Sequence, residues 1–350
     1  MQHTSVLDDN YLAITLLVTC GYQLVFFIVT VSARFDKVTD LAGGSNFAVL
    51  ALLTFLLART YYARQCVVTA LVVVWALRLA GFLLYRILLW GEDRRFDDTR
   101  HNLGRLAVFW IFQAVWVWTV SLPVTILNAG SRPQSAGRAL FAADYVGWVL
   151  WAIGFALEAV ADGQKLRYKQ RRAEHRPTEW CAVGVWRYSR HPNYFGEMLL
   201  WWGVFIACTA AFDGEAGLWI AGVASPVFLM LLLLLVSGLP MLEKSMDQRF
   251  GTSAAPPEVR TRYRQYKRET SPLLPLPPSL YRRLPRGLKR WLLLEWPLYN
   301  PAEAVAISDE AAPTSVDAAM LRHPTDAAVA GDKAVPTFED ATVAKYEAIR

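Results

Sequence analysis

Long apolar stretches alternate with short polar ones over the first 240 residues of the chain. A helix needs about 20 residues to cross a bilayer core roughly 30 Å thick, and seven apolar stretches come close to that length. They cover residues 11–31, 41–58, 66–90, 106–127, 140–161, 194–212 and 218–239. The pattern predicts an all-α, multi-pass bundle of about seven membrane-spanning helices, of which the short stretch 41–58 is the weakest candidate.

The basic residues of the connecting segments alternate from one side of the predicted membrane to the other. One set of segments holds two, four, seven and twelve Lys and Arg residues, in the order 32–45, 91–105, 162–188 and 241–300. The other set holds none, two, two and none, in the order 1–10, 59–65, 128–139 and 213–217. Because cytosolic loops carry the excess of Lys and Arg, the N-terminus is predicted outside and the C-terminus in the cytosol.

Three kinds of segment follow the last predicted span. Residues 241–270 carry apolar side chains at helical spacing, which predicts a helix lying against the membrane. Residues 271–278 contain four prolines and cannot be helical, because proline lacks the backbone N–H. Residues 287–299 combine Lys and Arg with Trp and Leu, a composition that suits an interfacial anchor.

Composition agrees with a membrane protein and narrows its partners. Hydrophobic residues make up 54% of the 350 residues and charged residues only 19%, against about a quarter in soluble domains. Many of the 14 Trp residues lie near the ends of apolar stretches, where an amphipathic ring settles at a bilayer interface. The lipid bilayer is therefore the expected partner. Nucleic acid is not expected, because the basic residues lie between the spans.

The net charge of +6 is unevenly distributed. Residues 301–350 hold four Lys and Arg against nine Asp and Glu, are rich in Ala, and show no apolar periodicity. Such a composition predicts a disordered acidic tail. The four cysteines are scattered without a C-x-x-C pair, so neither a disulfide framework nor a metal site is expected.

A few polar side chains lie inside predicted spans, where each costs a few kcal/mol and is by default a functional candidate. They are Arg78, Arg86, Gln113, Asp144 and Glu158. The alternative is that such side chains snorkel to the interface or pair with one another, which we favour for Arg86 and Asp144 near span ends. For the deeper Arg78 both alternatives stay open.

The densest polar cluster lies where the fifth span ends and the sixth begins, within residues 158–169 and 186–197. Both segments meet the same leaflet, so they can face each other. Pro192 suits the first turn of a helix, whose free N–H groups and dipole favour an anion such as phosphate. The alternative is that these residues only mark the basic side of the membrane boundary.

The stretch Ser189-Arg-His-Pro-Asn-Tyr-Phe-Gly-Glu197 resembles the C-terminal signature of the steroid 5α-reductase superfamily, in particular its DUF1295-type subgroup of multi-pass proteins. The resemblance extends to residues 35–41, 75–79, 161–165 and 237–244. It implies an all-helical membrane enzyme that binds NADPH in a cytosol-facing pocket between the last spans. The residues that the resemblance assigns to this pocket are Asp162, Gln164, Lys165, Arg187, Arg190, His191, Asn193, Tyr194, Glu197 and Glu243.

This resemblance predicts one transmembrane reductase-like domain over residues 1–300, with its cofactor half at about 140–275. It departs from the reductases on the substrate side, because their early-span Glu and third-span Tyr are missing here. Arg78 and Tyr85 lie seven apart, and so on one helical face, and are candidates to polarise and protonate a carbonyl or alkene instead.

Three functions stay open. The first is NADPH-dependent reduction of a lipophilic unsaturated substrate of sterol, polyprenol or fatty-acyl type, in the endoplasmic reticulum if the source is eukaryotic. The second is transfer of a methyl group from S-adenosylmethionine, because isoprenylcysteine and phospholipid methyltransferases are similar in Arg190–Gly196, Glu243, Phe250-Gly251 and Tyr263-Arg-Gln-Tyr266. The third is a non-enzymatic membrane scaffold, since a fold does not fix a function.

Overall fold

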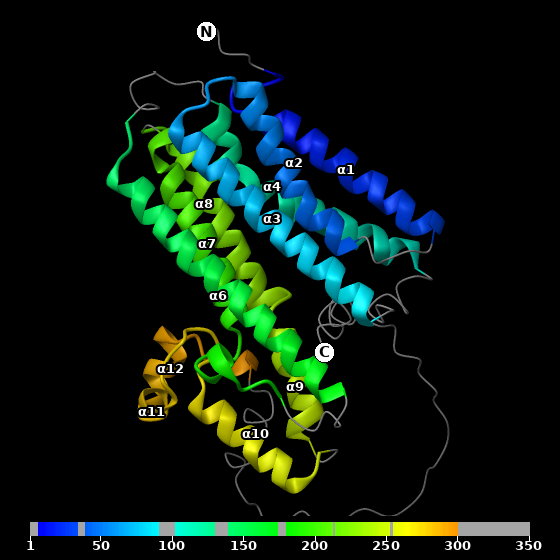
Figure 1. The fold of residues 1–350 in the computed structure, drawn as a ribbon, viewed down its shortest axis with the longest axis vertical. Helices are drawn as coiled ribbons and strands as arrows, with labels where there is room; N and C mark the ends of the chain where they lie inside the picture. The colour runs from blue at the N-terminus through cyan, green and yellow to red at the C-terminus, as the bar shows by residue number, and fades with distance from the viewer. Residues whose placement is uncertain are drawn as a thin grey trace, which may run out of the picture.

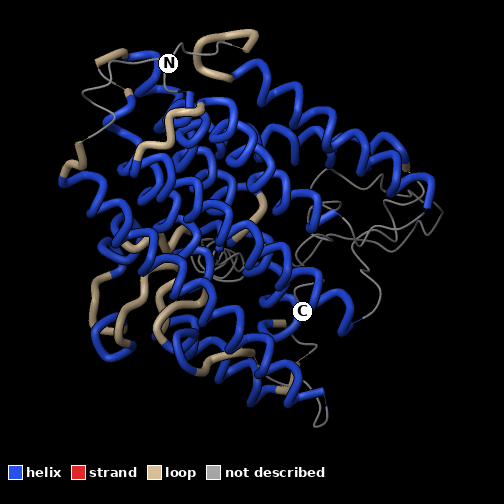
Figure 2. The backbone as a smooth tube through the Cα atoms, turned by 45° about the horizontal axis from the view of Figure 1, so that its top comes forward, coloured by secondary structure: helices blue, strands red, loops and turns tan. Residues whose placement is uncertain are grey.

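The computed structural model describes residues 6–33, 39–90, 102–129, 139–173, 180–212, 214–252 and 255–299. Within these ranges the chain is helical and contains no strand (Figures 1 and 2). The predicted all-α fold is confirmed. The predicted tail 301–350 lies outside the described residues.

Seven helices of the described part are long and apolar enough to cross a membrane, which agrees with the predicted spans. Each apolar stretch forms a helix because the backbone groups of a spanning segment must be satisfied within the segment itself. The first six spans are formed by α1 (Leu12–Ala33), α2 (Thr39–Ala58), α3 (Ala63–Trp90), α4 (Leu103–Ala129), α6 (Ala142–Ala173) and α7 (Pro192–Cys208). The seventh candidate span, Ala216–Gly251, includes α8 (Ala216–Leu231) and continues beyond it.

The bundle has two parts that meet along α4. Helix α4 packs against α1, α2 and α8, while α6 and α7 form the most extensive helix pair of the molecule. Buried aromatic rings join the parts, since Phe47 of α2 lies 5.2 Å from Trp75 of α3 and 5.5 Å from Trp201 of α7, measured between ring centroids.

Glycines set the close approach of α6 and α7. A Cβ atom at Gly154 would lie 2.5 Å from the carbonyl oxygen of Gly196, and one at Gly147 would lie 2.5 Å from that of Gly203. The two glycines of each helix are seven residues apart and meet the other pair in antiparallel order. Small residues allow helix backbones to pack this closely in a membrane. This pairing fixes which residues at the end of α6 face the turn before α7.

One end of the molecule, which we call the basic pole, is built by the segments after α8. The π-helical turn η5 (Leu232–Val236) leads into α9 (Leu239–Met246) and the π-helical turn η6 (Asp247–Gly251). The short helices α10 (Pro257–Glu269), α11 (Pro278–Tyr281), α12 (Arg286–Leu292) and η7 (Pro297–Tyr299) follow (Figure 1). The loop charges of the sequence predict that this pole faces the cytosol.

The segment 241–270 was predicted as one helix, and the structure divides it. Helix α9 and turn η6 end at Gly251, and α10 begins at Pro257. Pro256 and Pro257 cannot donate the backbone hydrogen bonds that a continuous helix would need there, so the chain turns. The proline-rich stretch after α10 is not helical before Pro278, as predicted.

Candidate functional site

The end of α6 and the turn before α7 lie against each other. Gln164 accepts a hydrogen bond from the backbone N–H of Val185 at 2.9 Å. The indole N–H of Trp186 donates to the carbonyl oxygen of Ala161, also at 2.9 Å, and the Lys165 ammonium lies 4.5 Å from the centre of the Trp186 ring. The structure therefore brings together the two segments that the sequence predicted to face each other.

This contact requires a glycine in the turn. Gly184 has a φ of +58°, a left-handed conformation that side chains disfavour. A Cβ atom there would also lie 2.2 Å from the side-chain oxygen of Gln164. The 3-10 turn η3 (Gly184–Arg187) can close only because this position has no side chain.

The proline-rich stretch after α10 holds the start of α7. The backbone N–H of Arg190 donates to the carbonyl oxygen of Ser271 at 2.9 Å, and the Ser189 hydroxyl donates to that of Leu273 at 2.7 Å. Because prolines keep residues 271–277 out of a helix, their carbonyl groups are free to accept these bonds. Pro192 then occupies the first turn of α7.

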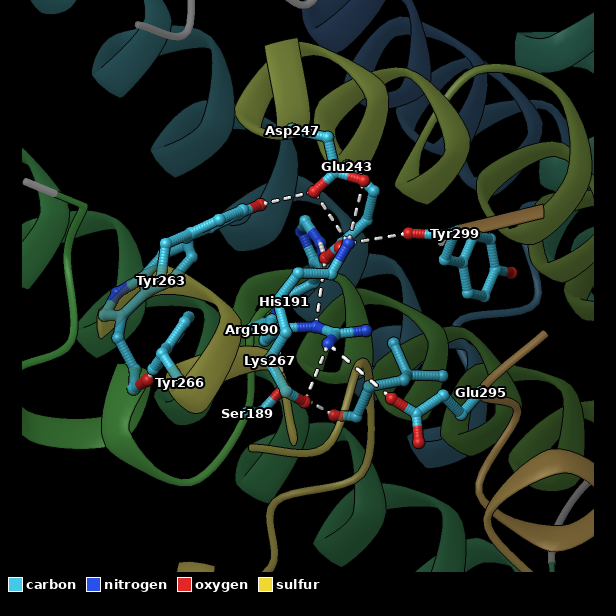
Figure 3. Close-up of polar contacts among 12 residues, drawn as sticks. Ser189, Arg190, His191, Glu243, Asp247, Tyr263, Tyr266, Lys267, Glu295 and Tyr299 are labelled. Atoms are coloured by element: carbon cyan, nitrogen blue, oxygen red, sulfur yellow. Dashed lines mark hydrogen bonds and ion pairs between the residues drawn. The ribbon is translucent and has the colours of Figure 1, made fainter. Parts of the chain in front are cut away.

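A buried network of charged side chains, which we call the polar cluster, surrounds this start of α7 (Figure 3). Its members come from the two residues before α7, from α9 and the turn η6, and from α10. They are Arg190, His191, Glu243, Asp247, Tyr263 and Lys267.

Glu243 lies at the centre of the polar cluster. One of its oxygens lies 2.8 Å from His191 Nε2 and 3.1 Å from Arg190 Nε. Its other oxygen lies 3.1 Å from Lys267 Nζ. Lys267 also pairs with Asp247 at 2.8 Å, and the Tyr263 hydroxyl donates to the same Asp247 oxygen at 2.9 Å. The cluster ties α7, α9 and α10 into one unit.

Residues 278–299, which we call the C-terminal strap, pack against the polar cluster. Glu295 lies 3.7 Å from Arg190 Nη1. The carbonyl oxygen of Tyr299 accepts from Lys267 Nζ at 2.8 Å, and its hydroxyl donates to the carbonyl oxygen of Leu234 at 2.7 Å. The strap therefore completes the site with residues from near the end of the described chain.

Burial and charge shift the titration of the groups around Glu243. Burial lowers the pKa of His191, and the hydrogen bond to Glu243 offsets part of that effect. Burial also raises the pKa of Tyr263 well above its usual value. His191 is therefore neutral at pH 7, with its Nε2 proton directed at the carboxylate and its Nδ1 left as an acceptor.

Several buried polar atoms at the start of α7 have no hydrogen-bond partner among the described residues. They are His191 Nδ1, Asn193 Oδ1, Arg190 Nη2 and Ser271 Oγ. A buried polar atom without a partner costs about 1–3 kcal/mol, so native proteins supply one from the chain, water or a ligand. Two of these atoms are acceptors and one is a guanidinium donor, so a ligand here must offer both donor and acceptor groups.

A second polar site, the intramembrane triad of Arg78, Glu158 and Asp162, joins α3 to α6. Arg78 Nη1 lies 2.6 Å from Glu158, and its Nη2 pairs with Asp162. Trp75 donates its indole N–H to the other Glu158 oxygen at 3.1 Å. The triad is therefore internally paired, and its two carboxylates share one guanidinium.

The other predicted site residues are not among the charged side chains that form the two polar sites. Tyr194 is buried, and its ring stacks on His191 with a centroid distance of 5.7 Å. Glu197 is half-buried beside the α6–α7 contact, and Arg187 is exposed. Tyr85 is half-exposed, and the structure gives it no hydrogen bond to the intramembrane triad among the described residues. Arg78 and Tyr85 are therefore not brought together, although they share a helix.

Sequence reasoning did not single out some of the site residues, namely Asp247, Lys267, Glu295 and Tyr299. Two of them carry a local signal. Asp247 lies four residues after Glu243, and Lys267 lies four after Tyr263, so each pair occupies one helical face. Glu295 and Tyr299 have no such signal, because only the path of the chain after α10 brings Glu295 to Arg190 and Tyr299 to Lys267.

Comparison with known proteins adds one match. Residues 26–270 match a family model whose description is "Protein of unknown function (DUF1295)". No curated protein and no solved structure matches the chain. The matched residues include the intramembrane triad and the polar cluster, whereas the C-terminal strap lies beyond them.

Proposed function

The chain belongs to the DUF1295 family, and we propose that it is a membrane reductase of the steroid 5α-reductase superfamily. It takes NADPH at the start of α7 and reduces a lipophilic unsaturated substrate that reaches it from the bilayer. The observation that carries this proposal is the set of buried, unpartnered polar atoms on Arg190, His191 and Asn193.

These atoms fit a nicotinamide dinucleotide by the chemistry of their groups. His191 Nδ1 and Asn193 Oδ1 are acceptors, which suit ribose hydroxyl or carboxamide N–H donors. Arg190 Nη2 is a donor for a phosphate or carbonyl oxygen. Lys165 and the exposed Arg187 add positive charge at the same turn, which favours the phosphates.

The intramembrane triad is the candidate source of the proton. NADPH would supply the hydride, and reduction of a double bond then needs one proton from the protein. Two carboxylates share one guanidinium in the triad, so one carboxyl group can carry a proton while the other keeps its ion pair with Arg78. It is built inside the membrane-spanning helices α3 and α6, which an apolar substrate can reach sideways through lipid.

One observation favours S-adenosylmethionine as a second candidate ligand. Together with Glu295, the polar cluster holds three carboxylates against the two cations Arg190 and Lys267, with His191 neutral. This excess of negative charge suits a cationic sulfonium. The methyltransferase-like residues Glu243 and Tyr263 also lie in the cluster, beside Phe250, whose ring lies 5.7 Å from that of Tyr263.

Thermal unfolding of the purified protein in mild detergent tests these alternatives. A ligand that binds only the native state raises the melting temperature. We expect NADPH to raise it, NADH to raise it less, and S-adenosylmethionine to leave it unchanged. The rise with NADPH should be lost in His191→Gln and in Asn193→Ala.

The matched control is Arg264→Gln, which changes an exposed cation on α10 outside the polar cluster. It should keep the full response to NADPH. A rise with S-adenosylmethionine alone would replace the reductase by the methyltransferase. No response to any of the three ligands would favour a scaffold without a cofactor.

A further inference from the structure

The C-terminal strap has an inner face on the polar cluster and a different outer face. Tyr281, Glu295 and Tyr299 point inward, where they make hydrogen bonds and ion pairs. Trp291 and Leu292 of α12 point away from the protein, with 78% and 65% of their surface exposed. Neighbouring apolar side chains this exposed mark an interaction surface, and Trp and Leu are residues that settle at bilayer interfaces.

The outer face is also strongly basic. Arg282 and Arg283 are exposed in the turn after α11, and Arg286 and Arg290 are exposed on α12. The strap has one carboxylate, Glu295, and that group is directed inward at Arg190. Positive charge on the outer face is therefore not balanced by any acidic residue of the strap itself.

We propose that this outer face binds the anionic phospholipid headgroups of the leaflet next to the basic pole. The arginines would contact headgroup phosphates, while Trp291 and Leu292 enter the boundary between headgroups and acyl chains. The combination of cations with exposed Trp and Leu favours a lipid surface, because a soluble polyanion would use the cations and leave the apolar pair in water.

Lipid binding would have a consequence for the polar cluster. The strap reaches Arg190 through Glu295 and Lys267 through the Tyr299 carbonyl. Helix α12, which carries the exposed Trp291 and Leu292, has no buried residue, whereas α11 is anchored by the buried Tyr281. A bilayer that holds the outer face therefore also holds the inner face on the cluster. This inference concerns lipid alone and does not depend on which cofactor the site takes.

Hydrogen–deuterium exchange of the full-length protein in nanodiscs tests the inference. Exchange of the peptide that covers 286–299 is compared between phosphatidylcholine nanodiscs and nanodiscs that also contain phosphatidylglycerol. We expect slower exchange with the anionic lipid. In the double variant Arg286→Glu/Arg290→Glu, the slowing of exchange by phosphatidylglycerol should be smaller on the order of tenfold. Each basic residue near the bilayer surface contributes to the attraction.

The control is Arg264→Glu, a charge reversal on the exposed face of α10, which should keep the lipid effect. Thermal unfolding in phosphatidylcholine verifies that each variant is folded. Equal exchange in the two lipids, or the same lipid effect in the double variant, would overturn the inference. Stronger protection by soluble heparin than by the anionic bilayer would also overturn it, in favour of a polyanionic partner.

Discussion

At the scale of residues, the charges of the polar cluster and of the intramembrane triad are buried and paired within each site. Glu243 is buried and contacts three basic side chains, while Arg78 bridges two carboxylates within the membrane-spanning part. An ion pair in such surroundings is not primarily a source of stability, because desolvation offsets much of the attraction. Replacing only one partner of the pair, however, leaves the other charge buried without compensation. The loss of stability in such a variant can be measured.

The intramembrane triad predicts strong coupling between its members. Arg78→Gln removes the cation and leaves two carboxylates facing each other, so it should destabilise the protein by about 3–5 kcal/mol. Adding Glu158→Gln and Asp162→Asn to the same chain removes the stranded charges and should restore much of the melting temperature. Thermal unfolding of the single and triple variants measures this. Additive losses from the three changes would contradict a coupled triad.

His191 predicts a pH dependence of stability. Burial lowers its pKa in the folded protein below the value of about 6.5 in the unfolded chain. As the pH falls through 6.5, the unfolded chain takes up the proton first, so folding stability is lost toward acid and is fully present above 6.5.

Between about pH 6.5 and 5, the free energy of unfolding should fall less steeply in His191→Gln than in the wild-type protein. The difference in slope is up to about 1.4 kcal/mol per pH unit, which corresponds to one proton. The measurement is the melting temperature of both proteins across this range. A steeper decrease in the variant would show that His191 is protonated in the folded protein.

At the scale of elements, the α6–α7 pair positions the site. Its glycines at 147, 154, 196 and 203 bring the two backbones together, and the same register sets Gln164 against Gly184 and Val185. The polar cluster depends on this register, since His191 directly precedes α7. Changing the spacing of the two helices should therefore affect the site as well as the stability.

Gly154→Ala tests the contribution of the close approach. The new methyl group would stand 2.5 Å from the Gly196 carbonyl oxygen, so the helices must separate, at a cost of about 1–3 kcal/mol. Gly163→Ala is the matched control on the same helix, because nothing lies within 4 Å of its Cβ position. It should leave the melting temperature unchanged or raise it slightly, since Ala favours helices over Gly. Equal losses in both variants would contradict a specific packing cost at Gly154.

The sequence predicts the elements better than their contacts. Spans follow from hydropathy, which is a local property, and the meeting of α6 and α7 follows from topology. The sequence does not predict the partners of Arg78, because they depend on how the helices are rotated. It also does not predict the contact of Glu295 with the polar cluster, which depends on the path of residues 271–277. Tyr85 illustrates this limit. The spacing from Arg78 puts both on one helical face, but Tyr85 is half-exposed, and the donors to the triad carboxylates are Arg78 and Trp75.

At the scale of the whole molecule, helix α6 carries two carboxylates of the intramembrane triad and also contacts the turn that leads to the polar cluster. Glu158 and Asp162 face Arg78 of α3, and Gln164 and Lys165 face the turn η3, which precedes Arg190 and His191. One helix therefore connects a charged group among the membrane-spanning helices with a polar cluster at the basic pole. This arrangement suits an enzyme that takes a polar cofactor from the cytosol and an apolar substrate from lipid.

The most direct test of this account is the equilibrium affinity of the purified protein for NADPH, followed by the fluorescence of the reduced nicotinamide. We predict saturable binding that weakens about tenfold in His191→Gln and again in Asn193→Ala, since one hydrogen bond is worth on the order of 1.4 kcal/mol. Binding should be unchanged in Arg264→Gln. The absence of saturable binding to the wild-type protein, or equal affinities in all four proteins, would contradict a cofactor site at the start of α7.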